Sequence, residues 1–196
     1  MSKALVIVAH PDDETIWMGG TILRNKSWNW VIFSLSRKDD PDRAPKFIKT
    51  CSRYGAQPII ADLEDNELKP VSTEEIVSKI KENLKIFDYD YIYTHGENGE
   101  YGHLRHQEIH QAVRFMVVSG GLKCRKLFYY SYEPGGKSVP GILELKIPFP
   151  RKNSDSYTLL NNEEFKAKIQ LIAEYGFKPK SFERLSCSRK EAFNLH

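Results

Sequence analysis

The most informative segment of this sequence of 196 residues is Ala4-Leu5-Val6-Ile7-Val8-Ala9-His10-Pro11-Asp12-Asp13-Glu14. Its apolar half is short and rich in β-branched side chains, which predicts a strand buried on both faces. Pro11 stiffens the turn that follows and has no N–H to satisfy. The segment therefore predicts one imidazole and two adjacent carboxylates held on a constrained loop at the carboxyl end of a strand.

Beyond this segment the apolar pattern alternates between two periods. Short β-rich runs recur at Trp30–Leu35, Pro58–Ala61, Tyr89–Tyr93 and Lys126–Tyr132. Helical spacing is found in between, at Gly19–Lys26, Phe47–Tyr54, Thr73–Phe87, His106–Val118 and Asn161–Tyr175. Alternating strands and helices are typical of an α/β fold. We predict one domain, residues 1–196, with a Rossmann-like three-layer sandwich and a mainly parallel sheet.

The C-terminal third breaks this alternation. Residues 136–156 are rich in Pro and Gly, and we expect a variable loop there, with one strand at Ile142–Ile147. Residues 178–196 are predicted to form a basic tail. Its simplest interpretation is a solvated terminus, and the alternative is a contact with an anionic substrate or a membrane surface.

Composition excludes several classes of protein. Hydrophobic residues make up 40% and charged residues 28%, which are ordinary values for a globular protein. The formal net charge of +3 is too small to indicate nucleic-acid binding. Three widely spaced cysteines argue against a disulfide framework and for a cytoplasmic protein. No apolar run reaches the roughly 20 residues of a membrane-spanning helix, and the short first run does not resemble a secretory signal. A homo-oligomer is compatible with the sequence.

Titratable side chains gather in two places, both at predicted carboxyl ends of strands. His10, Asp12 and Asp13 follow the first strand, and His103 and His106 begin the helix after the fourth. In an open α/β sheet, ligands bind at this edge. Zinc takes imidazole and carboxylate ligands, and a catalytic zinc has three protein ligands plus water. A set of two histidines and one aspartate fits that count.

Two other interpretations use the same residues. The carboxylates of Asp12, Asp13 and Glu14 could hold magnesium for phosphoryl transfer. Against this, the sequence has no Gly-x-x-x-x-Gly-Lys-Ser/Thr loop, and magnesium has little use for imidazoles. A non-catalytic Rossmann-like module that binds a sugar or nucleotide is the second alternative. Measuring which metal the protein holds distinguishes the magnesium-dependent enzyme from a zinc enzyme.

The paired motifs resemble those of the PIG-L / LmbE family of zinc-dependent deacetylases. The resemblance rests on His-Pro-Asp-Asp-Glu after a buried strand, then Gly19-Gly20-Thr21, then Gly-His-x-x-His, in the family's order. It implies one Zn²⁺ per chain, which Fe²⁺ could replace, held by His10, Asp13 and His106. It also implies that Asp12 is the general base, and that His103 stabilises the oxyanion or protonates the leaving amine.

The resemblance further implies the substrate class, a small-molecule N-acetylglucosamine-type conjugate that loses acetate. Arg43 and Asp65 match positions that contact the sugar in relatives, although Lys46 stands where many relatives have Glu. Tyr132, at a predicted strand end, is a further candidate for the wall of a sugar site. The group attached to the sugar is left open, as are the roles of His95 and His110.

Overall fold

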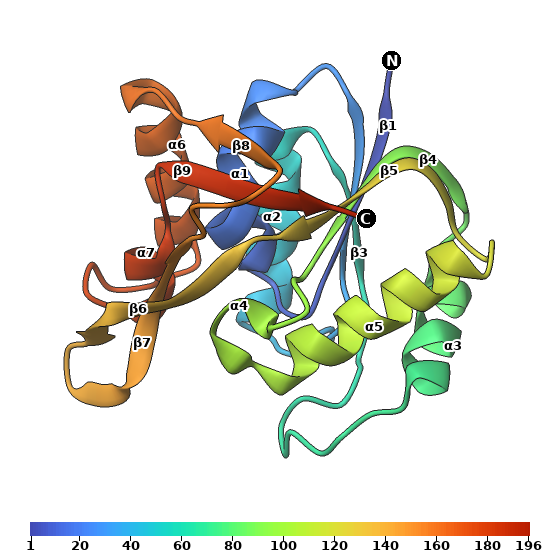
Figure 1. Cartoon of the computed structure of the whole chain (residues 1–196), viewed down its shortest axis with the longest axis horizontal. Coiled ribbons are helices and arrows are strands. Elements are labelled where there is room, and N and C mark those ends of the chain that lie inside the picture. The colour runs from blue at the N-terminus through green and yellow to red at the C-terminus, as the bar shows by residue number, and fades with distance from the viewer.

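The computed structural model describes all residues from 1 to 196. Nine strands and seven helices follow one another in the order shown in Figure 1. The strands are β1 (Lys3–Val8), β2 (Asn29–Ser34), β3 (Gln57–Ile60), β4 (Asp88–Thr94), β5 (Lys123–Tyr130), β6 (Tyr132–Val139), β7 (Ile142–Pro150), β8 (Ser156–Leu159) and β9 (Lys190–Leu195). The helices are α1 (Asp13–Arg24), α2 (Arg43–Tyr54), α3 (Thr73–Asn83), α4 (Gly99–Gly102), α5 (Leu104–Val118), α6 (Asn162–Glu174) and α7 (Phe182–Ser186).

The main sheet has the strand order β3-β2-β1-β4-β5-β9-β8. Strands β3, β2, β1, β4 and β5 are parallel, and β9 and β8 are added antiparallel at one edge. This confirms the predicted α/β fold with a mainly parallel sheet. The chain order reverses between β1 and β4, which is the switch point where such sheets bind ligands.

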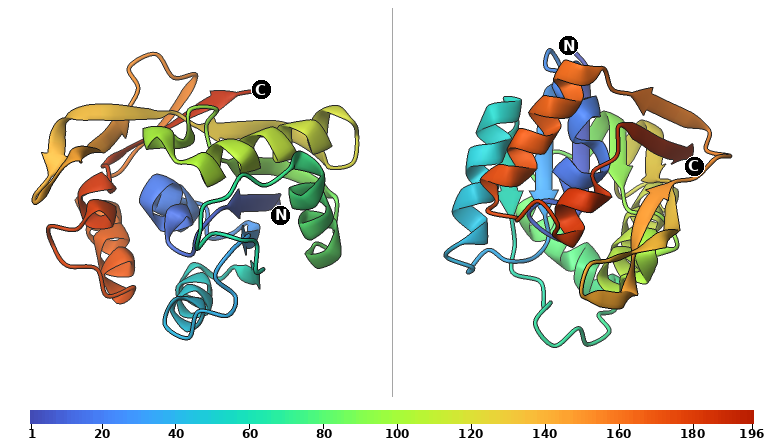
Figure 2. Two further views of the ribbon diagram at one scale, coloured as in Figure 1. Left: turned by 90° about the horizontal axis from the view of Figure 1, so that it is seen from below. Right: turned by 90° about the vertical axis from the view of Figure 1, so that its left-hand side faces the viewer.

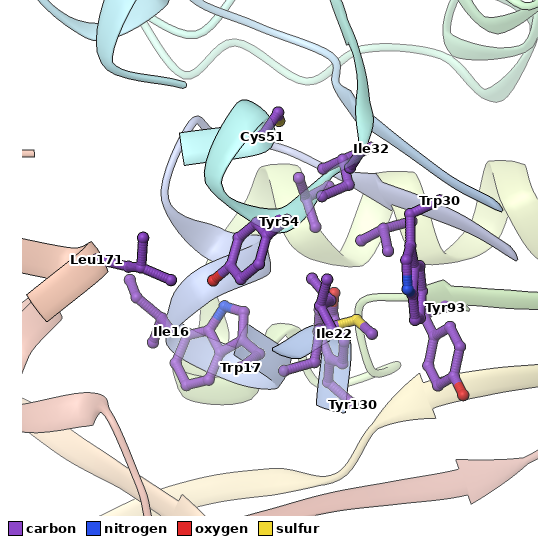
Figure 3. Packing of buried hydrophobic residues seen from close by; sticks show 14 of the residues in the cluster. Ile16, Trp17, Ile22, Trp30, Ile32, Cys51, Tyr54, Tyr93, Tyr130 and Leu171 are labelled. Atoms are coloured by element: carbon purple, nitrogen blue, oxygen red, sulfur yellow. The ribbon is translucent and has the colours of Figure 1, made fainter. Parts of the chain in front are cut away.

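Side chains that alternate along β1 divide the core into two layers. Ala4, Val6 and Val8 face one cluster, which α1, α2 and α6 cover. Figure 3 shows part of this cluster, where Trp17, Tyr54 and other large side chains interlock. The intervening residues of β1 face the other cluster, which α3 and α5 cover. Figure 2 shows helices lying on both sides of the sheet, the three-layer arrangement that the sequence predicts.

Two C-terminal expectations need correction. The predicted loop at 136–156 is largely an antiparallel hairpin, in which β6 and β7 form a separate sheet. The predicted tail at 178–196 contains α7 and β9, and β9 is an internal strand of the main sheet. Ala192 and Phe193 are buried there, and their apolar contacts offset the entropy lost in ordering this segment.

Helix α1 is kinked near its middle, and a carboxylate distant in the sequence accepts hydrogen bonds from the backbone N–H groups that the kink leaves without helical partners. Met18 has non-helical backbone angles (φ −146°), so the N–H groups of the next turn lose their helical partners. Glu191 of β9 accepts hydrogen bonds from the N–H of Gly20 at 2.8 Å and of Thr21 at 2.7 Å. Lys168 of α6, also fully buried, pairs with the same carboxylate at 2.7 Å. The C-terminal part of the chain is therefore tied to the helix that begins at the candidate site.

Candidate metal centre and its pocket

Two segments meet at the switch point of the sheet. His10, Asp12 and Asp13 follow β1, and Asp13 is the first residue of α1. His95 follows β4, and after the short helix α4 the chain enters α5 with His103 as its N-cap residue and His106 in its first turn. The predicted meeting of the two motifs across the sheet edge is therefore present.

Three side-chain atoms of the predicted ligands form a nearly equilateral triangle. Nδ1 of His10 lies 3.2 Å from Oδ2 of Asp13 and 3.3 Å from Nε2 of His106. The same Nε2 lies 3.4 Å from Oδ2 of Asp13. Tetrahedral zinc with bonds of about 2.0–2.1 Å places its donor atoms about 3.3 Å apart. These three residues therefore fit a tetrahedral ion without rearrangement.

The second polar atom of each of these residues is held by a neighbour. Trp17 donates to Oδ1 of Asp13 at 3.0 Å, which leaves Oδ2 for the metal. Nε2 of His10 donates to Asp65 at 3.0 Å, and Nδ1 of His106 donates to Glu100 at 2.6 Å. A carboxylate behind a ligating imidazole fixes its tautomer and raises its basicity.

His95 is stacked on His106 with ring centroids 3.8 Å apart, but its nitrogens are occupied. Nε2 of His95 accepts the N–H of Ala9 at 2.9 Å, and Nδ1 donates to Glu100 at 2.9 Å. Although Nε2 lies 3.6 Å from Oδ2 of Asp13, its lone pair is used by Ala9. His95 therefore supports His106 rather than acting as a ligand.

Asp12 lies beside the three candidate ligands, in an unusual backbone conformation. Its φ is 127°, a region that favours glycine, and Glu14 accepts its N–H at 3.1 Å. Arg43 donates to its Oδ2 at 2.5 Å. Burial, followed by the charge of Asp13, raises the pKa of Asp12 well above its usual range. The fold thus presents a carboxylate next to the metal-binding atoms, paired with a guanidinium.

His103 borders the same space, with its ring centroid 4.9 Å from that of His10 and 4.5 Å from that of His106. Its Nδ1 is buried and has no hydrogen-bond partner in the chain. Burial and the neighbouring imidazoles lower the pKa of His103 to about 3, so this ring is neutral. The unpartnered nitrogen is the kind of group that a bound molecule or water would satisfy.

The residues predicted to contact the sugar differ in their position relative to the pocket. Arg43 lines the pocket, in contact with Asp12. Asp65 is buried behind His10, and Arg37 donates to its other oxygen at 2.6 Å. Tyr132 is fully buried and donates to the backbone oxygen of Trp17 at 2.9 Å, so the expectation that it lines the pocket is wrong.

The loop that carries Asp65 is itself anchored to α5. Arg105 lies between the two histidines of the second motif and is completely buried. It pairs with Glu108 on its own helix, and donates to Glu64 at 3.2 Å and to the backbone oxygen of Lys69 at 3.0 Å. The second motif therefore supplies both a candidate ligand and the contact that holds the adjoining loop.

A cavity of about 230 Å³ opens over two of the candidate ligands, His10 and Asp13, while His106 lies buried behind them. Its walls are formed by His10, Pro11, Asp12, Asp13, Ile16, Arg37, Asp40, Arg43, Tyr101, Phe182 and Glu183. A larger cavity, of about 800 Å³, lies against α5 and β5 and includes His110, whose Nδ1 donates to the backbone oxygen of His95 at 2.9 Å. It contains none of the candidate ligands, so we place the functional site in the smaller one.

Two residues essential to this geometry are not predicted by the sequence pattern. No role is predicted for Glu100, and Glu14 is expected only as a candidate magnesium ligand. Glu14 lies within the first motif and Glu100 lies two residues before the second. An acidic residue close to several histidines in the sequence is a signal that could have identified Glu100. Phe182 and Glu183 carry no such signal, because they follow the motifs by more than 70 residues.

The structure is an α/β fold with a cluster of histidine and aspartate side chains that could hold a metal at the switch point of its sheet. A model of the family "PIG-L: GlcNAc-PI de-N-acetylase" matches residues 5–117, more than half of the chain. The chain belongs to this family. No helix combines the length and the apolar character that crossing a membrane requires.

One curated relative is the uncharacterized protein L374 of Acanthamoeba polyphaga mimivirus. The two sequences are 27% identical over 120 residues, which is 54% of this chain and 53% of the relative. The chain thus spans about half the length of this relative.

Similar solved structures cover almost the entire chain. A conserved protein of Thermus thermophilus superposes with a TM-score of 0.68 at 16% identity, covering 99% of this chain and 94% of its own. The N,N'-diacetylchitobiose deacetylase of Pyrococcus horikoshii has a TM-score of 0.60 at 16% identity, over 100% and 84% of the two chains. The 4-carboxy-2-hydroxymuconate hydratase of Pseudomonas putida also reaches 0.60, at 12% identity over 100% and 96%. Because a deacetylase and a hydratase share this fold, the reaction must be argued from side chains.

Proposed function

We propose that this protein is a zinc-dependent hydrolase that removes the acetyl group from the amide nitrogen of an N-acetylglucosamine-type conjugate. The observation that carries the proposal is the triangle of donor atoms from His10, Asp13 and His106, with the carboxylate of Asp12 beside it. Its spacing and its two imidazoles favour zinc, while iron(II) accepts the same ligands. The name of the family and the chitobiose deacetylase with the same fold support an acetamido sugar as substrate.

The chain's own residues divide the work of such a hydrolysis. When bound, the metal lowers the pKa of a coordinated water toward about 7 and polarises the substrate carbonyl. Asp12 takes the proton of the attacking water as general base, and Arg43 orients its carboxylate. That proton is then passed to the amide nitrogen as the C–N bond breaks, which releases the amine of the sugar and acetate. His103 donates a hydrogen bond to the carbonyl oxygen as negative charge develops there. Preorganised donors of this kind contribute about 3–4 kcal/mol to the transition state.

The two alternatives from the sequence receive less support. Magnesium prefers six oxygen ligands, whereas two of the three converging atoms are imidazole nitrogens. A protein that only binds sugars does not require three converging metal-donor atoms with a carboxylate beside them. Neither alternative explains why each ligand has a dedicated hydrogen-bond partner behind it.

Two substitutions at the centre test the proposal through different properties. Asp12→Ala should abolish acetate release while the zinc content, measured by elemental analysis, remains one ion per chain. His106→Ala should lose the metal as well as the activity, because it removes one of the three donor atoms. Asp88→Ala, at the opposite end of β4 and exposed, is the matched control and should change neither property. Full activity of the Asp12→Ala protein would contradict the assignment of the base.

A further inference from the structure

One wall of the pocket comes from outside the region that the family model matches. Phe182 and Glu183 belong to α7, and they line the cavity together with Tyr101. The rings of Phe182 and Tyr101 pack edge to face, with centroids 4.6 Å apart. Helix α7 packs against α1, beside the segment that starts at the metal ligands. The C-terminal part of the chain, orange to red in Figure 1, therefore completes the pocket.

Both guanidinium groups of the pocket already have carboxylate partners. Arg43 is paired with Asp12 at 2.5 Å, and Arg37 with Asp65 at 2.6 Å. Arg37 also donates to the side-chain oxygen of Asn66 at 3.1 Å. A phosphate entering the pocket would have to compete with these carboxylates for both arginines.

The two remaining carboxylates in the wall differ in their contacts. Asp40 accepts the N–H groups of Asp42 at 2.9 Å and Arg43 at 2.8 Å, at the start of α2. The carboxylate of Glu183 takes part in none of the chain's ion pairs or hydrogen bonds, and its residue is only half-buried. Glu183 is therefore a free hydrogen-bond acceptor, with a negative charge, at the wall of the pocket.

We propose that Glu183 determines specificity, and that it selects substrates whose N-acetyl sugar carries a hydroxyl- or amine-bearing substituent rather than a phosphate. The cavity of about 230 Å³ lies below the roughly 300–1,000 Å³ of most small-molecule pockets. In a cavity of this size, the wall that α7 provides lies within reach of a substituent on the sugar. A hydroxyl or ammonium group donates to Glu183 there, whereas a phosphate meets the like charge of Glu183 and two guanidinium groups that are each already paired with a carboxylate. Phe182 supplies an apolar face for the sugar whatever its substituent.

This inference rests on the proposed function, so the test uses binding of products, which needs no turnover. The zinc-loaded protein, residues 1–196, is titrated calorimetrically with chitobiose, a neutral-to-cationic disaccharide, and with glucosamine 1-phosphate. We expect tighter binding of chitobiose by the unaltered protein. Glu183→Gln should reduce the ratio of the two affinities about fivefold, and Glu183→Lys should reduce it further and favour the phosphate. Phe182→Ala should weaken both ligands and leave their ratio unchanged.

The control is Glu163→Gln, an exposed carboxylate in the first turn of α6, which should leave the ratio as it is. An unchanged ratio in both Glu183 variants, preference of the unaltered protein for the phosphate, or no binding of either probe would overturn the inference. Acetate release from the two acetylated compounds is measured in parallel. Charge-selective binding without acetate release would contradict the proposed function alone. Acetate release that is equal for both compounds, and unaffected by Glu183, would contradict this inference alone.

Discussion

The carboxylate of Glu100 accepts a hydrogen bond from Nδ1 of His106 at 2.6 Å, and both side chains are completely buried. The same carboxylate accepts from Nδ1 of His95 and, at 2.7 Å, from the N–H of Gly96. Glu100 adopts a φ of 59°, a left-handed conformation that costs energy for a side chain of this size. The fold maintains this conformation at the point where the carboxylate aims Nε2 of His106 toward His10 and Asp13.

Replacing Glu100 with Gln should weaken zinc binding about 10–100-fold, because the amide fixes the tautomer of His106 less well and lowers its basicity. Competition with a chromophoric chelator measures the affinity. Glu97→Gln, on the same loop but exposed, is the control and should bind zinc as the unaltered protein does. Equal affinities for Glu100→Gln and the unaltered protein would show that His106 needs no such partner.

The stability of the metal-free protein should fall in acid because of the same carboxylate. Burial opposes its ionisation, but His95 and His106 outweigh this effect and lower the pKa of Glu100 from 4.5 to about 2. A carboxyl group whose pKa is lower in the folded state stabilises the fold above the unfolded pKa. That stabilisation is lost as the pH falls from 4.5 toward 2, by on the order of 3 kcal/mol.

Urea unfolding at several pH values measures this loss. In Glu100→Gln the free energy of unfolding should depend less on pH between 5 and 2, since the titrating group is gone. Parallel pH profiles for the two proteins would argue that Glu100 does not contribute through its charge.

The buried pair of Glu191 and Lys168 should be far more sensitive to single than to double substitution. Glu191→Gln leaves the ammonium of Lys168 buried without a counter-charge, which costs about 3–5 kcal/mol. Lys168→Met leaves the carboxylate with its bonds to Gly20 and Thr21 but also without a counter-charge. A double-mutant cycle in urea should find that the two losses are not additive. Additive losses would mean that the pair is not coupled.

Gly20→Ala should destabilise the protein by about 1–3 kcal/mol through overpacking. A Cβ atom at this position would lie 2.2 Å and 2.4 Å from the two methyl carbons of Leu160. Leu160→Ala in the same chain removes the clash, so the alanine at position 20 should cost less in that background. The midpoint of thermal unfolding, measured for the four proteins of this cycle, checks the expectation. An equal cost of Gly20→Ala in both backgrounds would rule out the contact with Leu160 as its cause.

The local motifs predicted that the candidate ligands meet, because these residues lie in two short segments that follow neighbouring strands. His10, Asp13 and His106 converge as expected. The supporting groups were harder to predict. Glu100 contacts His95, Gly96 and His106, which are close in the sequence, but its role depends on the left-handed backbone at this position. Glu191 contacts Gly20 and Thr21, which come near it only after the sheet has formed, and nothing in the sequence around Glu191 marks it as buried.

The C-terminal region was harder to predict for a different reason. Prolines and glycines in residues 136–156 suggest a loop, but β6 and β7 form a two-stranded sheet outside the main one, where proline is tolerated at strand edges. Tyr132 lies at a strand end, as expected, yet its ring turns into the core and packs on Trp17 at 5.0 Å. Whether a side chain at a strand end points into the core or into a pocket is decided by tertiary packing, which the local sequence spacing does not reveal.

The most direct test of the proposed activity is acetate release from N-acetylglucosamine conjugates by the purified chain, in the presence of a chelator and after zinc is added back. We predict release that the chelator abolishes and that zinc restores. Release that persists after complete removal of the metal would contradict the role of the centre. The absence of release from every conjugate by a chain that holds one zinc ion would contradict the proposed deacetylation.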